Sequence, residues 1–225
     1  MLKYKNLLVS GCSFTFNKGW AEHIKHQYKI NLINVACSGA GNTHIANSIV
    51  HKLEFNPELT ATNTYVIIMW SGADRMDTMC DIAHQNVRAH YKYNDSIMTL
   101  TTGGIHRKQG VLGALYDVKN EDILALETFL NTTNTYHYLK SRGYQFKFLA
   151  HRDVKLPAKD RAFDWHARIP EPVDSTHMFT HCMTPYEYAL KNDGLSDDEY
   201  HPTEQSFVQW CDKHLLPEIH HDLVD

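Results

Sequence analysis

The stretch from Leu2 to Thr15 reads LKYKNLLVSGCSFT and joins an apolar run to a glycine and a serine. The run from Leu2 to Ser10 has the length and the apolar content of a β-strand. It stops at Gly11, because glycine and serine are typical of turns. This arrangement puts Ser13 just beyond the carboxyl end of the first strand of the chain. The segments that follow decide what kind of sheet contains this strand.

Strand-like and helix-like segments alternate along the rest of the chain. The patterns predict helices over 20–28, 43–54 (with Asn42 as N-cap) and 121–142, strands over 32–36, 64–70 and 144–149, and a last helix opened by Pro202 and Thr203. Such alternation is typical of an α/β fold, a three-layer α/β/α sandwich with a mainly parallel central sheet of the flavodoxin-like type. Ligands of such sheets bind outside the carboxyl ends of the strands. Ser13, Gly39 and the segment 71–75 all follow a predicted strand, so we expect them to meet there.

The length of 225 residues predicts a single domain over 1–225. Two stretches do not fit the alternation. Residues 76–119, with Gly103-Gly104 and scattered tyrosines, are interpreted as a possible insertion over the site. Residues 152–197, with several prolines, are interpreted as a long loop region.

The bulk composition excludes some classes of function. A net charge of -4 and a pI near 6.4 argue against a nucleic-acid binder that neutralises phosphates. No apolar run approaches a membrane span, and the start of the chain does not have the pattern of a signal peptide. The cysteine count is odd, at five, and there is no C-x-x-C. We therefore expect a cytoplasmic protein with reduced thiols, no membrane partner and no nucleic-acid partner.

No metal site or cofactor is expected from the sequence. His177, His181 and Cys182 offer possible metal ligands, but no second cluster completes a set of four. Gly39 and Gly41 follow a predicted strand, as in a phosphate-binding loop, but the G-x-G-x-x-G pattern is incomplete because residue 44 is histidine. A flavodoxin-like nucleotide binder stays open as an alternative that would hold phosphate at residues 39–42.

Near the other end of the chain, Asp198-Glu199-Tyr200-His201 puts a carboxylate three residues before an imidazole. A serine hydroxyl becomes a good nucleophile when a histidine takes its proton, and a carboxylate orients that histidine and stabilises its charged form. The spacing lets Asp198 and His201 project from one turn toward a serine delivered by a distant strand end. Each piece is also common elsewhere: a serine after a glycine as a turn residue, and Asp-x-x-His before a Pro-led helix as a cap.

Two further segments complete a pattern in chain order: residues 34–42, NVACSGAGN, and residues 66–75, VIIMWSGADR. Together with Ser13 and the Asp198–His201 turn, they resemble the four sequence blocks of the SGNH hydrolases, also called the GDSL esterase/lipase family. The resemblance runs from Leu7 to about Leu216 through short motifs. It implies Ser13 as nucleophile, Asp198 and His201 as the acid–base pair (with Asp197 as the fallback), and the backbone N–H groups of Ser13 and Gly39 as the oxyanion hole.

The chain departs from this family pattern in two places. The first block reads Gly-Cys-Ser-Phe rather than Gly-Asp-Ser-Leu, which keeps the serine and its glycine. The third block has Ala73 where the family has an asparagine that donates to the oxyanion. Loss of one such donor costs about 10²–10³ in rate. Either another group substitutes, with Ser71 and Arg75 as the nearest candidates, or the protein is a weak or specialised catalyst. An α/β-hydrolase fits less well, because its Gly-x-Ser-x-Gly elbow would need glycine where Thr15 stands.

The resemblance therefore implies a serine esterase that uses a Ser-His-Asp triad and no cofactor. The expected substrate is an O-acyl ester on a carbohydrate or another small molecule. The alternative, which Ala73 favours, is a non-catalytic SGNH-like domain that binds a glycan or serves in a larger assembly.

Overall fold

The computed structural model describes residues 1–16, 19–72, 75–81, 91–92, 97–101, 121–151, 183–198 and 200–225 of the chain. The helices of this part are α1 (Ser13–Phe16), α2 (Gly19–Tyr28), α3 (Asn42–Glu54), α5 (Glu121–Ser141), α7 (Pro185–Lys191), α8 (Glu204–Trp210), the π-helical turn η1 (Cys211–Leu215) and α9 (Leu216–Leu223). The strands are β1 (Asn6–Ser10), β2 (Asn31–Asn34), β3 (Thr64–Trp70), β4 (Asp77–Asp81), β5 (Tyr91–Lys92), β6 (Ile97–Thr101) and β7 (Gln145–Ala150).

The central sheet has four parallel strands in the order β2-β1-β3-β7. All seven residues of β3 are buried, as expected for a strand covered on both faces. The chain steps from β1 outward to β2 and then returns to the other side of β1 for β3. The carboxyl ends of β1, β2 and β3 therefore flank the topological switch point, where ligands of open α/β sheets bind.

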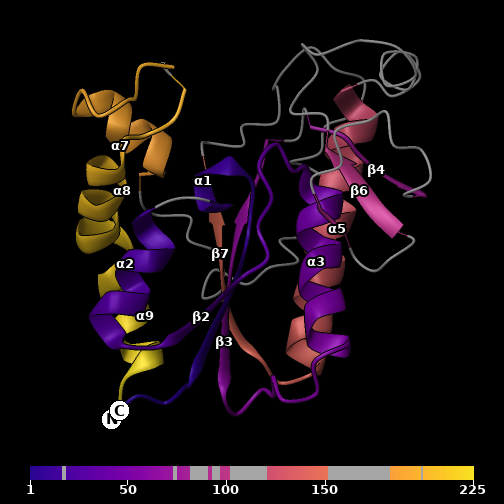
Figure 1. Ribbon diagram of the computed structural model, residues 1–225, viewed down its shortest axis with the longest axis horizontal. Helices are drawn as coiled ribbons and strands as arrows, with labels where there is room; N and C mark the ends of the chain where they lie inside the picture. Colours follow the sequence, from indigo (N-terminus) through magenta and orange to yellow (C-terminus); the bar gives the residue numbers. More distant parts are fainter. Residues whose placement is uncertain are drawn as a thin grey trace.

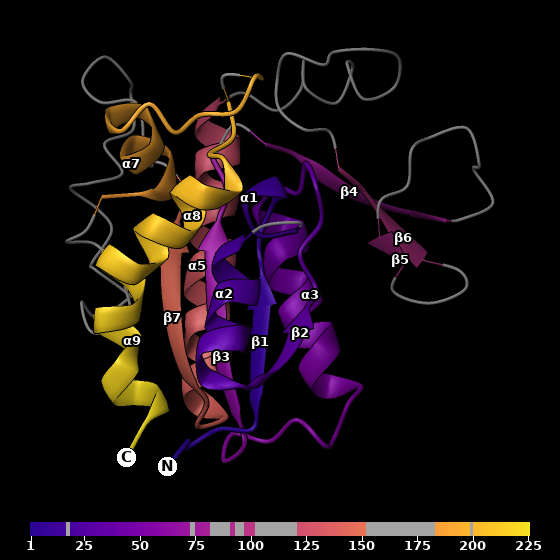
Figure 2. The same cartoon turned by 60° about the vertical axis from the view of Figure 1, so that its left-hand side comes forward.

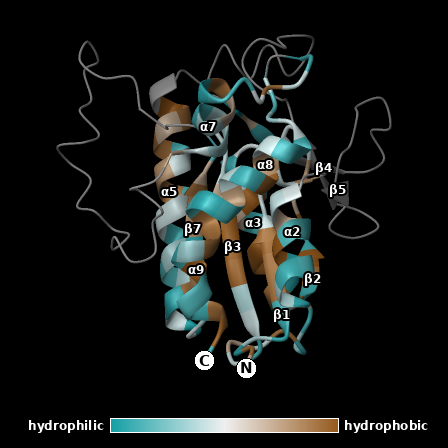
Figure 3. Ribbon diagram, turned by 90° about the vertical axis from the view of Figure 1, so that its left-hand side faces the viewer, coloured by the Kyte–Doolittle hydropathy of each residue, from teal (hydrophilic) through white to brown (hydrophobic). Residues whose placement is uncertain are grey.

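Helices cover both faces of this sheet, and α3 packs with α5 on one face (Figure 1). On the other face α2 packs with α8, and α9 continues below it (Figure 2). Figure 3 shows the apolar residues concentrated on the strands and the hydrophilic ones on the outer faces of the helices. The predicted α/β sandwich with a mainly parallel, flavodoxin-like sheet is confirmed.

A second, antiparallel sheet in the order β4-β6-β5 lies beyond α3 and apart from the central sheet (Figure 2). These strands fall within the stretch 76–119 that the sequence indicated as a possible insertion. The other residues of that stretch, 82–90, 93–96 and 102–119, lie outside the described residues.

Several elements differ from their sequence-based prediction. The strand predicted from Leu2 begins only at Asn6, and Leu2 forms an isolated bridge to Val224 instead. Within the predicted loop region 152–197, α7 is a helix that begins with a capping box between Thr184 and Glu187. Residues 152–182, which include the histidine–cysteine cluster at 177–182, lie outside the described residues.

The last helix begins at Glu204, with Thr203 as its N-cap, and it is not uniform. Pro217 lacks the N–H that an α-helix would donate one turn back. The chain accommodates this with the π-helical turn η1, in which the Leu216 N–H donates to the Cys211 carbonyl. Within the described parts of the chain, no helix has the length and the apolar character needed to cross a membrane.

Candidate active site

Ser13 is the first residue of α1, three residues after β1 ends. The turn between them closes through the N–H groups of Thr15 and Phe16, which both donate to the Cys12 carbonyl. A side chain at Gly11 has no room, because a Cβ there would lie 2.2 Å from Thr15 Oγ1 and 3.1 Å from the Met69 carbonyl oxygen. The glycine thus allows α1 to pack tightly over the strand ends, and this packing sets the position of Ser13.

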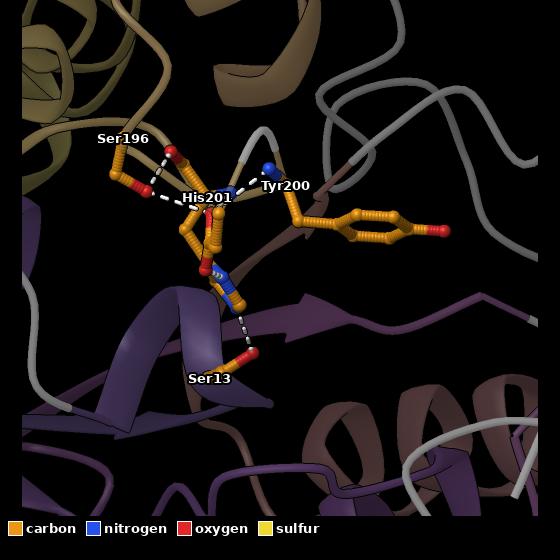
Figure 4. A network of polar contacts seen from close by, with 5 residues as sticks. Ser13, Ser196, Tyr200 and His201 are labelled. Carbon is orange, nitrogen blue, oxygen red and sulfur yellow. Dashed lines mark hydrogen bonds and ion pairs between the residues drawn. The ribbon is translucent and has the colours of Figure 1, made fainter.

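His201 reaches Ser13 from the other end of the chain. Its Nε2 lies 2.8 Å from Ser13 Oγ, and its Nδ1 lies 2.5 Å from Asp198 Oδ2 (Figure 4). The structure therefore brings together the three side chains that the sequence singled out, in the order Ser-His-Asp. With a proton on Nδ1 for Asp198, the Nε2 lone pair is free to accept the hydroxyl proton of Ser13.

The carboxylate of Asp198 is held by its own turn. Its Oδ1 accepts the backbone N–H groups of Tyr200 (2.9 Å) and His201 (2.8 Å) and the Ser196 hydroxyl (2.7 Å), as Figure 4 shows. Desolvation raises the pKa of Asp198, but these hydrogen bonds and the one to the imidazole outweigh it and hold the pKa well below its usual range. One oxygen thus fixes the turn, and the other is left for the imidazole.

The fallback residue, Asp197, has no hydrogen bond to His201 among those of the described residues. Ser196 was not predicted. Its N–H donates to the His201 carbonyl at 2.7 Å, and its hydroxyl lies 2.9 Å from the same oxygen. Ser196 therefore ties the two ends of the turn that carries the Asp-His pair.

An aromatic side chain lies against the imidazole. The ring of Phe14 is 5.2 Å from that of His201 and 4.7 Å from that of the buried His151, measured between centroids. Phe14 stands where the SGNH pattern has leucine. The Phe14 ring is thus an apolar contact for the His201 imidazole, next to Ser13 in the sequence.

Gly39 lies in the connection from β2 to α3, with a φ of 79°. A side chain disfavours this left-handed conformation, so glycine suits the position. The Ala40 N–H donates to the Cys37 carbonyl at 3.1 Å, and the Cys37 N–H donates to the Gly11 carbonyl, which ties this connection to the β1 end. Among the described residues, none accepts a hydrogen bond from the backbone N–H of Gly39 or Ser13.

The two candidate substitute donors differ in what they contact. Both backbone polar groups of Ser71 are bound by the Asn42 side chain, and its hydroxyl is buried with no partner among the described residues. Arg75 is half-buried, and its Nη1 lies 3.4 Å from the Ala40 carbonyl, next to Gly39. Arg75 is therefore the candidate that lies beside the Gly39 connection. Ala73 lies outside the described residues.

Asn42 does not have the predicted role of N-cap. The N-cap of α3 is Gly41, which has no capping side chain, and Asn42 uses its amide to bind Ser71 instead. Asp77, from β4, supplies the missing cap: its carboxylate accepts the N–H groups of Gly41 and His44, both at 2.8 Å. Sequence reasoning missed Asp77 because the segment after residue 76 has no clear periodicity.

This carboxylate weighs against the nucleotide-binding alternative. A phosphate at residues 39–42 would use the N–H groups at the start of α3, and Asp77 already accepts two of them. A second anion would also meet the negative charge of Asp77. In the parts of the chain that the structure describes, no three His, Cys, Asp or Glu residues are grouped as metal ligands would be.

The protein is similar to known proteins in its three-dimensional structure, and no similarity was found by sequence. No model of a protein family matches the sequence, and no curated protein matches it. The fold is similar to that of the psychrotrophic esterase EstA from Pseudoalteromonas sp., solved in a form inhibited by monoethylphosphonate, with a TM-score of 0.53. The two chains are 14% identical over 96% of this chain and 97% of EstA.

A second similar structure is the lipase Lip_vut3 from a goat rumen metagenome. It aligns with a TM-score of 0.50 and 13% identity over 95% of this chain and 96% of the lipase. The chain shares its fold with both proteins. The α/β fold is the one that the resemblance to the SGNH hydrolases implies. In both alignments the similarity in structure extends over nearly the whole length of the two chains compared.

Proposed function

We propose that the protein is a serine hydrolase that cleaves an O-acyl ester on a carbohydrate or another small molecule. The observation that carries the proposal is the contact of His201 with both Ser13 and Asp198, at 2.8 Å and 2.5 Å. Ser13 lies 188 positions from His201 in the sequence, and His201 lies three positions after Asp198. These polar side chains are at most partly buried, so the need to fill the core does not explain why they are aligned. A proton-transfer path from a hydroxyl to a carboxylate-supported imidazole is what nucleophilic catalysis by serine needs.

The chemistry follows from these positions. Ser13 Oγ bonds to the ester carbonyl carbon as its proton passes to His201 Nε2. The tetrahedral intermediate then expels the alcohol, which takes that proton, and an acyl group stays on Ser13. Water repeats the sequence, with His201 again as base and then as acid, and releases the carboxylic acid. Asp198 stays ionised throughout and stabilises the imidazolium.

The oxyanion of each intermediate needs donors that are oriented in advance. The backbone N–H groups of Ser13 and Gly39 are the proposed donors, since neither has an acceptor among the described residues. Arg75, beside Gly39, is the proposed substitute for the side-chain donor that Ala73 does not supply. Backbone groups on tight turns cost little reorganisation when charge develops.

Support for a small ester as substrate comes from the fold and from the surface near His201. The two similar proteins are an esterase and a lipase by name. Tyr200, next to His201, is 56% exposed, and its ring points away from the triad (Figure 4). An exposed ring with a hydroxyl offers an apolar face and a hydrogen-bonding tip to the part of a substrate that extends from the reacting carbonyl.

The test is steady-state hydrolysis of a short-chain aryl ester and of acetylated sugars by wild type, Ser13→Ala and Ser141→Ala. Ser141 is an exposed serine on α5 and serves as the matched control. We expect Ser13→Ala to lose at least about 10³ in kcat, with an unchanged melting temperature, and Ser141→Ala to keep wild-type activity. Wild-type turnover in Ser13→Ala would exclude Ser13 as the nucleophile.

The second candidate function is binding without catalysis, in an SGNH-like domain that holds a glycan or serves in a larger assembly. Ala73 in place of the family asparagine favours it. Absence of wild-type turnover across esters and pH, together with saturable binding of an unmodified oligosaccharide, would support this candidate over the hydrolase.

A further inference from the structure

Asp77 is a buried carboxylate that lies outside the triad, 8% exposed, at the start of β4. Both of its oxygens accept a backbone N–H, Oδ1 from Gly41 and Oδ2 from His44. The first N–H groups of a helix have no partner within the helix. Since Gly41 brings no side chain to cap α3, Asp77 provides the cap from a distant segment.

Residues from the segment between β3 and β4 also contact Ala40 and Asn42, the two neighbours of Gly41. The Asn42 side chain accepts the Ser71 N–H at 2.8 Å and donates to the Ser71 carbonyl at 3.0 Å. The Arg75 guanidinium lies 3.4 Å from the Ala40 carbonyl. The three residues that follow Gly39 are therefore each fixed from the segment that runs from the end of β3 to the start of β4.

The packing between the two segments is tight. A Cβ built on Gly41 would lie 2.9 Å from Asp77 Oδ2 and 3.0 Å from the Arg75 carbonyl oxygen. Backbone atoms at that distance cannot be moved aside as the end of a flexible side chain can. The connection after β2 thus has little freedom to shift relative to Asp77.

We propose that Asp77 is a positioning residue for catalysis, which fixes the Gly39 N–H in the orientation that receives the oxyanion. This inference rests on the proposed hydrolase function. An oxyanion donor is effective when its dipole already points at the place where charge develops. Because Ala73 supplies no amide, stabilisation of the oxyanion depends on the backbone donors and on Arg75. The orientation of the Gly39 N–H in turn depends on the contacts that hold the connection between β2 and α3.

The role differs from that of a plain helix cap. A cap stabilises the fold, and its loss lowers the fraction of folded protein without changing the turnover of the molecules that stay folded. A positioning residue for the oxyanion acts mainly in the transition state. Its loss lowers kcat and leaves KM nearly unchanged.

The experiment measures kcat and KM for a short-chain aryl ester with wild type, Asp77→Asn, Gly41→Ala and Glu187→Gln. The temperature is one at which circular dichroism shows each protein to be folded. Asp77→Asn replaces one acceptor oxygen by an NH₂ group that faces an N–H donor. Gly41→Ala keeps the carboxylate but forces the two segments apart. Glu187→Gln removes the negative charge of the capping box of α7, as Asp77→Asn does at α3, and is the matched control for the loss of a capping carboxylate.

We expect Asp77→Asn and Gly41→Ala to lower kcat by about 10- to 100-fold, below the full effect of a lost donor, with KM within about twofold. An arylboronic acid, which forms a charged tetrahedral adduct on the serine, should lose affinity by the same factor as kcat/KM. Glu187→Gln should keep wild-type kcat and boronate affinity, whatever its melting temperature. If Asp77→Asn does not accumulate as folded protein, Gly41→Ala decides the result.

Wild-type kcat in folded Asp77→Asn and Gly41→Ala would overturn the positioning role while leaving the hydrolase intact. An equal fall in kcat for Glu187→Gln would also overturn it, because the effect would then be general to helix caps. Absence of ester turnover and of boronate binding in the wild type would instead remove the proposed function, and this inference with it.

Discussion

The carboxylate of Asp198 contacts His201 twice. Its Oδ1 accepts the His201 backbone N–H at 2.8 Å, and its Oδ2 lies 2.5 Å from the ring nitrogen Nδ1. The short Asp-x-x-His spacing makes this double contact possible, because both groups belong to one turn. The backbone contact fixes where the carboxylate lies, so the side-chain contact can orient the imidazole toward Ser13.

Asp198→Asn should lower kcat by on the order of 10³–10⁴. The turn requires an acceptor at the Oδ1 position, so the asparagine keeps its carbonyl there and presents its NH₂ to Nδ1. The imidazole then accepts at Nδ1 and carries its proton on Nε2, which leaves no lone pair for the Ser13 hydroxyl. Steady-state kinetics with thermal melting as the folding control checks this. Activity within tenfold of wild type would mean that Asp198 does not orient His201.

Gly11→Ala should destabilise the fold by about 1–3 kcal/mol, as overpacking usually does, and should lower kcat because α1 moves with Ser13. The added Cβ would lie 2.2 Å from Thr15 Oγ1, a buried atom with no hydrogen-bond partner among the described residues. Thr15→Ala removes that atom together with a buried methyl group, so alone it should cost about 1 kcal/mol. It should restore part of the stability of Gly11→Ala and not all of it, because the Cβ of residue 15, 2.8 Å from the added Cβ, remains. Chemical denaturation of the two single variants and the double variant measures this coupling. Strictly additive free energies would show that the clash does not form.

Two buried groups at the start of α3 should give opposite pH dependences of stability. Burial raises the pKa of Asp77 to about 6 from 3.8, so its favourable contribution is present below pH 3.8 and is lost as pH rises through 6. Burial lowers the pKa of His44 to about 4 from 6.5, so its contribution is present above pH 6.5 and is lost as pH falls through 4. Between these values the two effects partly cancel.

Asp77→Asn should expose the His44 effect. The free energy of unfolding of this variant should rise with pH between 4 and 6.5 more steeply than that of the wild type, by up to about 1.4 kcal/mol per pH unit. Urea denaturation at half-unit pH intervals measures the two slopes. Parallel curves for both proteins would contradict the raised pKa of Asp77.

The sequence was sufficient for the sheet and for the three side chains that meet at its edge. The strand β3 is a continuous buried apolar run that is followed by Ser71 and Gly72, so its position and its end are visible in the sequence. The apolar run of β1 likewise shows where that strand ends, although it did not show where the strand begins. Ser13 and Gly39 follow such ends, and the Asp198–His201 pair is set by local spacing. The short helix α1 was missed, since four residues carry no periodic signal.

The supports of the site could not be predicted, because they arise from tertiary contacts. Asn42 has the sequence position of an N-cap, but it lies opposite the end of β3. Its side chain accepts the backbone N–H of Ser71 and donates to the Ser71 carbonyl instead. Asp77 begins an antiparallel strand in a stretch with no recognisable pattern, and only the fold places it at the start of α3. Ser196 gave no signal because a serine near a turn is common in any chain.

The most direct test of the account is to treat the folded wild-type protein with a fluorophosphonate probe and to map the modified residue by mass spectrometry. A serine activated by His201 should displace fluoride from phosphorus and retain the phosphonyl group. We expect the wild type to gain one phosphonyl group, on Ser13. We expect no labelling of Ser13 in His201→Ala or in heat-unfolded protein. Labelling that spares Ser13, or labelling of Ser13 that is equally fast in His201→Ala, would contradict the assignment of Ser13 and His201 as nucleophile and base.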